Sequence, residues 1–383
     1  MNKEGQITDL ENNEAPRRGF FSGILERPFL IHALKEAVFR PRKYKGKRKF
    51  HWLPIVIFFL VMAVVVMIDK SAQKKAKESP SLPAGWQTIR PPNEVSAMAI
   101  QGDIVWTGGK DGVFGLDRAS GKLIKEIKND PPFEYVRSVL VDRNGLLWIG
   151  HEHGLSFYDG KNLLTYTKKD GLPDDRVNAL YEDREGALWI GTCFGAGVRK
   201  NNQWRIINKA GGLIDDMVNI ILQDKNGGMW FGSYVAPYGG ISYLQDGKWQ
   251  YFSTANGLPH NNISSIFEDS SGAIWIGTGL LDRGGAVELK RSPDGWAVNR
   301  ILLKKNGLAG DKVRSIFEDR SGKFWFGSEY DGLALFKNGC FKILKEKDGL
   351  CNPEIKIMLQ DKDGNMWLGT RDGVTRISAQ TLP

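Results

Sequence analysis

The chain has 383 residues, of which 45 are glycine and 12 are tryptophan. Hydrophobic residues make up 41% of the sequence and charged residues 25%, which excludes both a disordered chain and a polytopic membrane protein. The many glycines indicate frequent turns, so neither a coiled coil nor a helical bundle is expected. The formal net charge is +9, but residues 1–50 hold 12 Lys and Arg against 6 Asp and Glu, and residues 69–80 hold 4 against 2. Residues 81–383 therefore carry only +1, and no nucleic-acid partner is expected.

A basic segment at the N-terminus precedes a long apolar run. Residues 1–49 end in RPRKYKGKRK, which places seven basic residues in ten positions. Residues 50–68 carry no charge over 19 positions, and a helix that rises about 1.5 Å per residue spans a hydrocarbon core of about 30 Å with this length. We predict a transmembrane helix at 50–68 and a linker at 69–85. The basic flank predicts a cytoplasmic N-terminus, a single-pass anchor in a bacterial inner membrane, and a periplasmic or extracellular C-terminal part.

A cleaved signal peptide is the alternative interpretation of the same segment, because a basic flank before an apolar run is typical of both. The apolar run is longer than the usual core of a signal peptide, and the 49 residues before it exceed the usual basic region. No clear A-x-A cleavage site follows it. The membrane anchor is therefore the better interpretation.

The tripeptide Trp-x-Gly recurs through the rest of the chain, at intervals of 42, 41, 41, 45, 50 and 42 residues. Its tryptophans are Trp106, Trp148, Trp189, Trp230, Trp275, Trp325 and Trp367. Upstream of six copies, a D-x-x-G turn joins two β-rich runs, as in VNALYEDREGALWIG at 177–191, so each copy predicts a hairpin. These turns lie at 142–145, 183–186, 224–227, 269–272, 319–322 and 361–364. The periodicity predicts that the tryptophans pack between structural units and bind no ligand.

Two further strands follow each hairpin, for example GLSFYDG at 154–160 and WRIINK at 204–209. Four strands in about 40 to 50 residues is the period of a β-propeller blade. The last copy begins at Glu354 and lacks a fourth strand, whereas WQTIR at 86–90 resembles one. We therefore expect an all-β, seven-bladed β-propeller over residues 86–383, closed by strand 86–90. Four tryptophans are expected near the starts of fourth strands: Trp86, Trp204, Trp249 and Trp296.

These motifs resemble the two-component regulator propeller repeat, in which a V-x-x-I-x-x-D-x-x-G run precedes L-W-I-G-T and a G-L step leads into the next blade. The G-L step stands here as GLPDD (171–175), GLIDD (212–216), GLPHN (257–261), GLAGD (307–311) and GLCNP (349–353). The resemblance covers residues 86–383 and implies the fold more strongly than an activity. Members of that family usually form the extracytoplasmic sensor region of hybrid histidine kinases. No kinase part is expected within 383 residues, so any signalling output would come from another polypeptide.

The resulting functional expectation is a membrane-anchored binding platform. It would sense a ligand for a separate signalling partner or act as a scaffold subunit of a membrane complex, and its expected partner is another membrane or periplasmic protein. A propeller enzyme, either a lyase or a hydrolase, is the alternative. The chain holds no G-x-S-x-G, HExxH, P-loop or C-x-x-C motif, so no catalytic residue, cofactor or small-molecule ligand is assigned from sequence.

Binding to propellers normally uses the face formed by the fourth-to-first and second-to-third strand loops, here called the loop face; the hairpin turns form the opposite turn face. The second-to-third loops of blades four and five, SYVAPYGG at 233–240 and TGLLDRGG at 278–285, are the longest. Aromatic and arginine residues on rigidly held loops favour contacts. The candidate recognition patch consists of Tyr234, Tyr238, Asp282, Arg283, Glu329, Tyr330 and Arg371. That these residues merely cover the blade ends is the competing interpretation.

Two patterns raise the question of a metal ion. His151 and His153 would point the same way in extended chain, and Cys193 on the next blade would supply a third ligand. The spacing has no further specificity, so no metal is assigned. The turns DKDGN at 361–365 and DKNG at 224–227 resemble calcium loops but lack their sixth-position glycine and terminal glutamate. A role as hairpin turns is the favoured interpretation.

Overall fold

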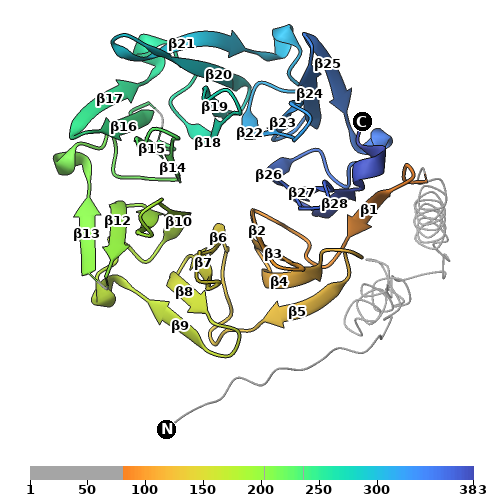
Figure 1. The fold of residues 1–383 in the computed structure, drawn as a ribbon, viewed down its shortest axis with the longest axis horizontal. Helices are drawn as coiled ribbons and strands as arrows, with labels where there is room; N and C mark the ends of the chain where they lie inside the picture. The colour runs from red at the N-terminus through yellow and green to blue at the C-terminus, as the bar shows by residue number, and fades with distance from the viewer. Residues whose placement is uncertain (1–80, 202, 236) are drawn as a thin grey trace, which may run out of the picture. The chain divides into compact units, whose positions relative to one another are not determined.

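The computed structural model describes residues 81–383 except residues 202 and 236, and in this part the chain forms seven four-stranded antiparallel sheets arranged in a ring (Figure 1). The fold expectation, an all-β seven-bladed propeller, is confirmed. Strands β2, β6, β10, β14, β18, β22 and β26 surround the centre, and the fourth strand of each sheet forms the outer rim (Figure 1).

The first six blades each use four consecutive strands. Blades one to three are β2 Ala97–Gln101, β3 Ile104–Gly109, β4 Gly112–Asp117 and β5 Leu123–Ile127; β6 Ser138–Val141, β7 Leu147–His151, β8 Gly154–Tyr158 and β9 Leu163–Tyr166; β10 Val177–Glu182, β11 Leu188–Thr192, β12 Gly195–Lys200 and β13 Gln203–Ile207. Blades four to six are β14 Ile220–Gln223, β15 Met229–Gly232, β16 Ile241–Gln245 and β17 Lys248–Phe252; β18 Ile263–Glu268, β19 Ile274–Leu280, β20 Arg283–Ser292 and β21 Gly295–Leu302; β22 Val313–Glu318, β23 Phe324–Ser328, β24 Leu333–Lys337 and β25 Cys340–Leu344.

Blade seven joins strands from the two ends of the described chain. Its first three strands are β26 Ile355–Gln360, β27 Met366–Thr370 and β28 Gly373–Ile377, and its outer strand is β1 Trp86–Ile89. Strand β1 pairs antiparallel with β28, with Trp86 opposite Ile377 and Ile89 opposite Val374. The strand expected at 86–90 thus occupies the outer position of blade seven, which leaves no blade without a fourth strand.

The Trp-x-Gly motif and the D-x-x-G turn are parts of one local unit. In blades two to seven, the turn aspartate accepts a hydrogen bond at Oδ2 from the indole Nε1 of the tryptophan six residues later, at 2.8–3.0 Å. Its Oδ1 accepts the backbone N–H four residues on. In blade one, which lacks this turn, Gln101 accepts from Trp106 at 2.8 Å. The turn aspartates are therefore structural, as the favoured interpretation of 224–227 and 361–365 requires.

The G-L steps carry the chain from the rim of one blade to the centre of the next. Each step begins with a 3₁₀ helix, and these are η1 Lys168–Asp170, η2 Lys209–Gly211, η3 Thr254–Asn256, η4 Lys304–Asn306 and η5 Glu346–Asp348. The following glycine has a φ of 108° to 117°, a left-handed conformation, and the leucine after it is buried. An added Cβ at this glycine would overlap a residue of the next blade's fourth strand, as at Gly212 against Trp249.

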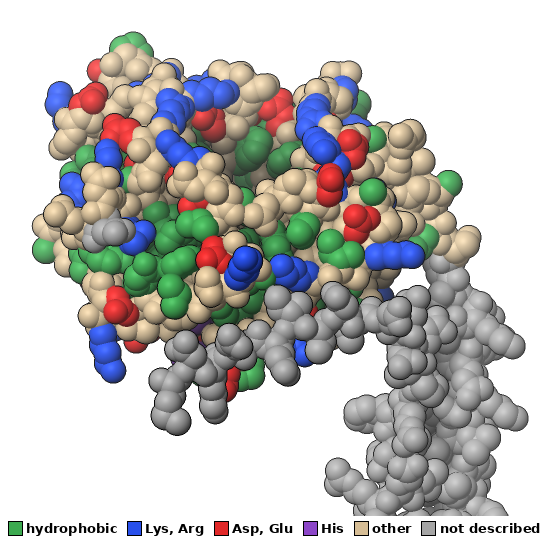
Figure 2. All heavy atoms as spheres, turned by 60° about the horizontal axis from the view of Figure 1, so that its bottom comes forward, with side chains coloured by type: hydrophobic (Ala, Val, Ile, Leu, Met, Phe, Trp, Pro, Cys, Tyr) green, Lys and Arg blue, Asp and Glu red, His purple; other side chains and the backbone are tan. Residues whose placement is uncertain are grey.

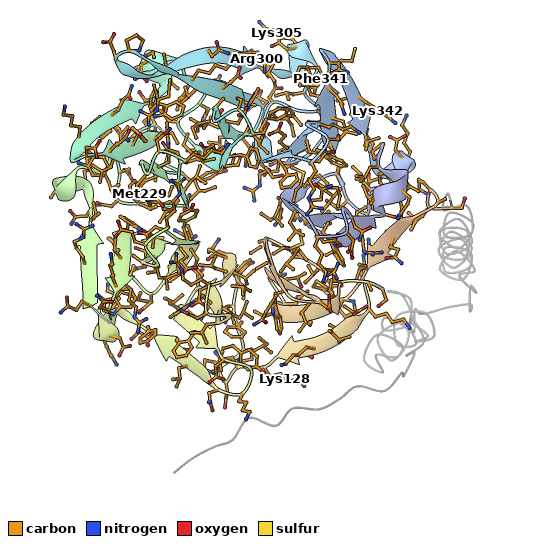
Figure 3. All side chains as sticks on the ribbon, in the orientation of Figure 1. Lys128, Met229, Arg300, Lys305, Phe341 and Lys342 are labelled. Atoms are coloured by element: carbon orange, nitrogen blue, oxygen red, sulfur yellow. The ribbon has the colours of Figure 1, made fainter. Side chains whose placement is uncertain are left out.

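The fourth strand of blade five departs from the expected pattern. Trp296 was expected to stand in the same position as Trp204, but Gly257 instead faces Val298, two residues later. Strands β20 and β21 are the longest of their blade and contain a bulge between Glu288 and Leu289, which shifts the register. Trp296 packs instead on Trp230 of blade four, with ring centroids 5.1 Å apart, so it still fills a seam between blades. Figure 3 shows Arg300, Phe341 and Lys342 along the rim of blades five and six.

On the turn face, hydrogen bonds and ion pairs link each blade to the next around the whole ring. The residue after the turn aspartate reaches the next turn: Arg143 donates to the carbonyl of Asp183 at 2.6 Å, and Arg184 to that of Asp224 at 2.8 Å. Equivalent contacts continue through Lys225, Ser270 and Arg320. Arg118 of blade one pairs with Asp363 of blade seven, and Gln101 donates to the carbonyl of Gly145 in blade two. All seven seams are thus bonded on this face, which makes the ring a rigid base for the loops opposite.

The predicted cytoplasmic segment 1–49, transmembrane helix 50–68 and most of the linker 69–85 lie outside the described residues. Within the part that is described, no helix has the length and apolarity needed to cross a membrane. The anchor therefore stays a prediction from sequence.

Candidate functional site

The loop face over blades four to six carries six of the seven residues of the candidate patch. Tyr234 and Tyr238 lie on the second-to-third loop of blade four, Asp282 and Arg283 on that of blade five, and Glu329 and Tyr330 on that of blade six. Arg371 lies apart from them, on blade seven. Three segments that are distant in sequence thus bring the first six residues to one sector of the face.

A buried ion pair anchors this sector. Lys312, only 5% exposed, precedes β22, and its ammonium group pairs with the carboxylate of Glu329. Tyr330 donates its hydroxyl to Oε1 of Glu329 at 2.6 Å, and Arg314 lies 3.7 Å from Oε2. Burial alone would raise the pKa of Glu329, but the hydrogen bonds from Lys312 and Tyr330 outweigh burial and lower it. The Glu329 carboxylate therefore stays charged, and it makes its ion pair and its hydrogen bond within the protein.

The other side of Lys312 faces blade four. Its ammonium nitrogen lies 5.5 Å from the ring centroid of Tyr234, a cation–π distance. Tyr234 also bridges Asn262 through the backbone, and Nδ1 of His260 accepts the N–H of Asn262 at 3.0 Å. In the neutral imidazole the proton is then on Nε2. Burial, followed by the positive charges of Arg283 and Lys312, lowers the pKa of His260, so this ring is neutral at pH 7.

The loop of blade five packs directly on the segment that carries Lys312. A Cβ at Gly279 would meet Cα of Lys312 at 2.9 Å, and one at Gly284 would meet the carbonyl oxygen of Asp311 at 2.7 Å. Both glycines have φ near 150°, so only glycine fits this close approach. Arg283, at the start of β20, is exposed, and its guanidinium has no hydrogen-bond or ion-pair partner among the described residues.

Exposed apolar side chains lie on the second-to-third loops of four consecutive blades. Their exposed fractions are 62% for Phe194, 73% for Tyr238, 67% for Leu281 and 54% for Tyr330. Tyr238 and Tyr330 belong to the candidate patch, whereas Phe194 does not. The sequence feature that could have identified Phe194 is its position in CFGAG, a short loop with no charged residue. Together these four residues form the apolar arc of the loop face over blades three to six.

The remainder of the loop face near the centre is dominated by ion pairs. Lys356 lies 2.7 Å from Glu94 and 3.7 Å from Glu354, which joins blades seven and one. Arg137 and Arg176 both approach Glu152, at 2.9 and 3.5 Å. On the side shown in Figure 2, basic and acidic side chains are likewise interspersed. Charge is therefore largely neutralised locally, whereas Arg283 and Arg371 pair with no group among the described residues.

The two histidines of the metal hypothesis face different partners. His151 ends β7 and is 2% exposed; its Nε2 lies 2.9 Å from Oγ of Ser156, and its Nδ1 accepts the N–H of His153 at 3.3 Å. His153 instead lies 3.2 Å from Oε2 of Glu134. Burial, with a smaller effect of His153, lowers the pKa of His151 to about 4. The Sγ of Cys193 accepts from Asn178. The described residues form no group of three or more metal-ligating side chains.

Comparison with known proteins supports the fold. The sequence profile described as two component regulator propeller matches five segments, at 171–194, 212–235, 257–279, 307–330 and 349–372. Each matched segment begins at the glycine of a G-L step and ends in a second-to-third loop or the strand that leads into it. Blades three to seven therefore each contain one segment that matches this profile. No curated protein sequence matches the chain significantly.

Among solved structures, the extracellular domain assigned to the hybrid two component system BT3049 of B. thetaiotaomicron has a TM-score of 0.66 at 22% identity, over 77% of this chain and 41% of that one. PorZ, a surface component of the type-IX secretion system of Porphyromonas gingivalis, gives 0.60 at 17%, over 78% and 48%. Virginiamycin B lyase from Staphylococcus aureus gives 0.59 at 13%, over 76% and 98%. This chain thus spans less than half of the first two, and at these identities the likeness shows the fold alone.

Proposed function

We propose that this protein is an extracytoplasmic binding platform that engages another protein through the loop face over blades three to six. The observation that supports this most is the apolar arc: four large apolar side chains are presented to solvent by successive loops of one rigid ring. Surface hydrophobic residues that stand singly need no explanation, but a group of them on one face favours an interaction site. The bonded seams of the turn face hold these loops in fixed relative positions.

The location of the platform rests on the N-terminal sequence. The uncharged run at 50–68 and the basic residues before it support a single-pass anchor in a bacterial inner membrane, with a cytoplasmic N-terminus and a periplasmic or extracellular propeller. The repeat profile and the extracellular origin of the BT3049 domain agree with this placement.

Two uses of the platform are compatible with the site. It is either the sensory part of a signal-transduction system whose output comes from another polypeptide, or a scaffold subunit of a membrane complex. In both, the partner is a membrane or periplasmic protein, and the loop face is the contact surface.

Site-specific photo-cross-linking in native membranes tests the platform. A photoreactive amino acid at Tyr238, in the apolar arc, is expected to give a discrete cross-linked product with a second protein. The matched control places it at Asn144, an exposed residue of a turn on the opposite face, where no such product is expected. A product at Asn144 and none at Tyr238 would contradict the proposal, because the contact would then lie on the turn face.

A further inference from the structure

We propose that the loop face binds a carboxylate group presented by a peptide segment of the partner, and that Tyr234, His260 and Arg283 receive it. These three residues, together with Lys312, which is buried and paired with Glu329, are here named the donor cluster. This inference deepens the proposed function and rests on it. It adds the chemistry of the partner: an acidic group flanked by apolar side chains.

The donor cluster is built by convergence of four loops. Tyr234 is linked to Asn262 by a backbone bridge, and His260 is fixed by the N–H of the same Asn262. Lys312 lies against the ring of Tyr234 on one side, and the loop of Gly279 and Gly284 packs on its backbone on the other. Arg283, the first residue of β20, lies between these two glycines and immediately precedes Gly284. Blades four, five and six therefore place all four side chains in one neighbourhood.

The cluster is rich in hydrogen-bond donors that the protein does not use. The Nε2–H of His260, the hydroxyl of Tyr234 and the guanidinium of Arg283 have no partner among the residues that the structure describes. Charge-assisted hydrogen bonds from such groups to a carboxylate are among the stronger polar contacts in proteins. Because Glu329 pairs with Lys312, the exposed guanidinium of Arg283 is the cation of the cluster that is available to an anion from outside.

Two of the four acidic residues on the same loops are paired within the protein. Glu329 pairs with Lys312 and accepts from Tyr330, and Asp331 lies 3.6 Å from Lys304. Asp282 and Asp311 have no side-chain partner in the described chain, so neither forms an ion pair with Arg283. Arg283 is thus available to a group from outside. A basic group on the partner would have to approach this unpaired positive charge.

The exposed side chains of the apolar arc favour a peptide that bears the carboxylate over a free carboxylate anion. Tyr238, Leu281 and Tyr330 lie on the second-to-third connections of blades four, five and six, the same three blades that carry the donor cluster, and are more than half exposed. A free carboxylate anion would leave these side chains in water, whereas a peptide with apolar residues beside its acidic one would cover them. Charge and apolar surface therefore point to the same occupant.

Fluorescence anisotropy with the full-length protein in detergent tests the inference. The probe is a labelled ten-residue peptide of alternating glutamate and leucine, blocked at both ends, compared with the same peptide in which lysine replaces glutamate. A second pair of ten-residue peptides alternates serine and leucine, and its two members differ only in a free or an amidated C-terminus. This pair distinguishes binding of a terminal carboxylate from binding of a side-chain carboxylate. We expect one carboxylate peptide to bind at least about tenfold more tightly than its uncharged or basic counterpart.

The matched variants are Arg283→Ala and Lys110→Ala, since both cations are exposed, lie at second-to-third connections of the same face and lack a partner in the described chain. Arg283→Ala is expected to weaken binding of the carboxylate peptide about tenfold, and Lys110→Ala, on blade one, to leave it unchanged. Equal affinities for acidic and basic peptides, or equal losses in both variants, would overturn the inference. If cross-linking at Tyr238 still succeeds in that case, the binding platform stands and only the carboxylate is wrong.

Discussion

In each D-x-x-G turn, the aspartate carboxylate accepts hydrogen bonds from backbone N–H groups that would otherwise donate to water. Asp224, for example, is fully buried, and its two oxygens accept the N–H groups of Asn226 and Gly228 and the indole of Trp230. A buried carboxylate is costly unless it is fully hydrogen-bonded. The three donors satisfy it, and the indole is held at the seam to the next blade. One short motif therefore sets both the turn and the orientation of the main aromatic side chain.

The buried imidazole of His151 makes the stability of the folded protein depend on pH. Its pKa falls from 6.5 to about 4 on folding, chiefly because burial disfavours the imidazolium. The folded state then binds fewer protons than the unfolded state between these values, so the contribution is complete above pH 6.5 and is lost as pH falls toward 4. We predict that lowering the pH from 7.5 to 4.5 costs about 2 to 3 kcal/mol of stability through this residue.

The measurement is the free energy of unfolding in urea for the full-length protein and for His151→Gln at both pH values. The variant is expected to lose less stability between them, because glutamine does not titrate. His153→Gln is the control, since His153 is exposed and pairs only with Glu134. If wild type and His151→Gln lose equal stability, burial does not hold His151 neutral in the folded protein.

At the scale of elements, the G-L steps decide how one blade is set against the next. The glycine with a left-handed conformation follows a 3₁₀ helix and packs against the fourth strand of the next blade. Gly171 contacts Trp204 in this way, and Gly307 contacts Phe341. A side chain at four of these five glycines would overlap an aromatic ring, and at Gly257 it would meet Val298. The leucine that follows enters the core of the seam, so the step couples a backbone conformation to packing between blades.

We predict that Gly212→Ala destabilises the protein by at least about 2 kcal/mol, through a strained φ of 114° and overlap with Trp249. Gly247→Ala is the matched control, because its φ is also positive, at 74°, but no atom lies within 4 Å of the added Cβ. It should show the backbone strain alone. Thermal denaturation of both variants measures the difference, and equal midpoints would mean that the contact with Trp249 adds nothing.

At the scale of the whole molecule, closure of the ring rests on β1. Trp86, 8% exposed, packs in one core cluster with Leu350, Met358 and Leu368, and it lies against Gly349 as Trp204 lies against Gly171. Arg118 adds a second connection between blades one and seven. The first and last described elements therefore meet in one blade, and loss of that contact opens the ring at a defined seam.

Trp86→Ala is predicted to cost about 3 to 5 kcal/mol and to open blade seven first. Hydrogen–deuterium exchange of the full-length protein should rise in β27 and β28, which lose their outer strand. Trp204→Ala, at the corresponding position of blade three, should instead raise exchange in β12 and β13. Unchanged exchange in β27 and β28 of Trp86→Ala would show that β1 does not hold the ring closed.

The sequence by itself determined the repeat, the number of blades and the identity of the outer strand of blade seven. These follow from local patterns: Trp-x-Gly with its turn, the strand period, and a missing strand whose match stands near residue 86. The long loop expected at 278–285 is instead a two-residue turn, because β19 extends to Leu280 and β20 begins at Arg283. The sequence did not show the place of Trp296, because β20 and β21 are long strands and a bulge at Asn299 of β21 shifts their register by an amount that no local pattern records.

Only the tertiary structure decided which loop residues act together. Lys312, Glu329, Tyr234 and His260 are separated by up to 95 positions, and their meeting depends on the angle and register at which three blades are packed. The same arrangement paired many charges of the loop face and left Arg283, like Arg371, without a partner among the described residues. Repeated strands specify each blade, but a site made of loops from several blades exists only once the ring has set their distances.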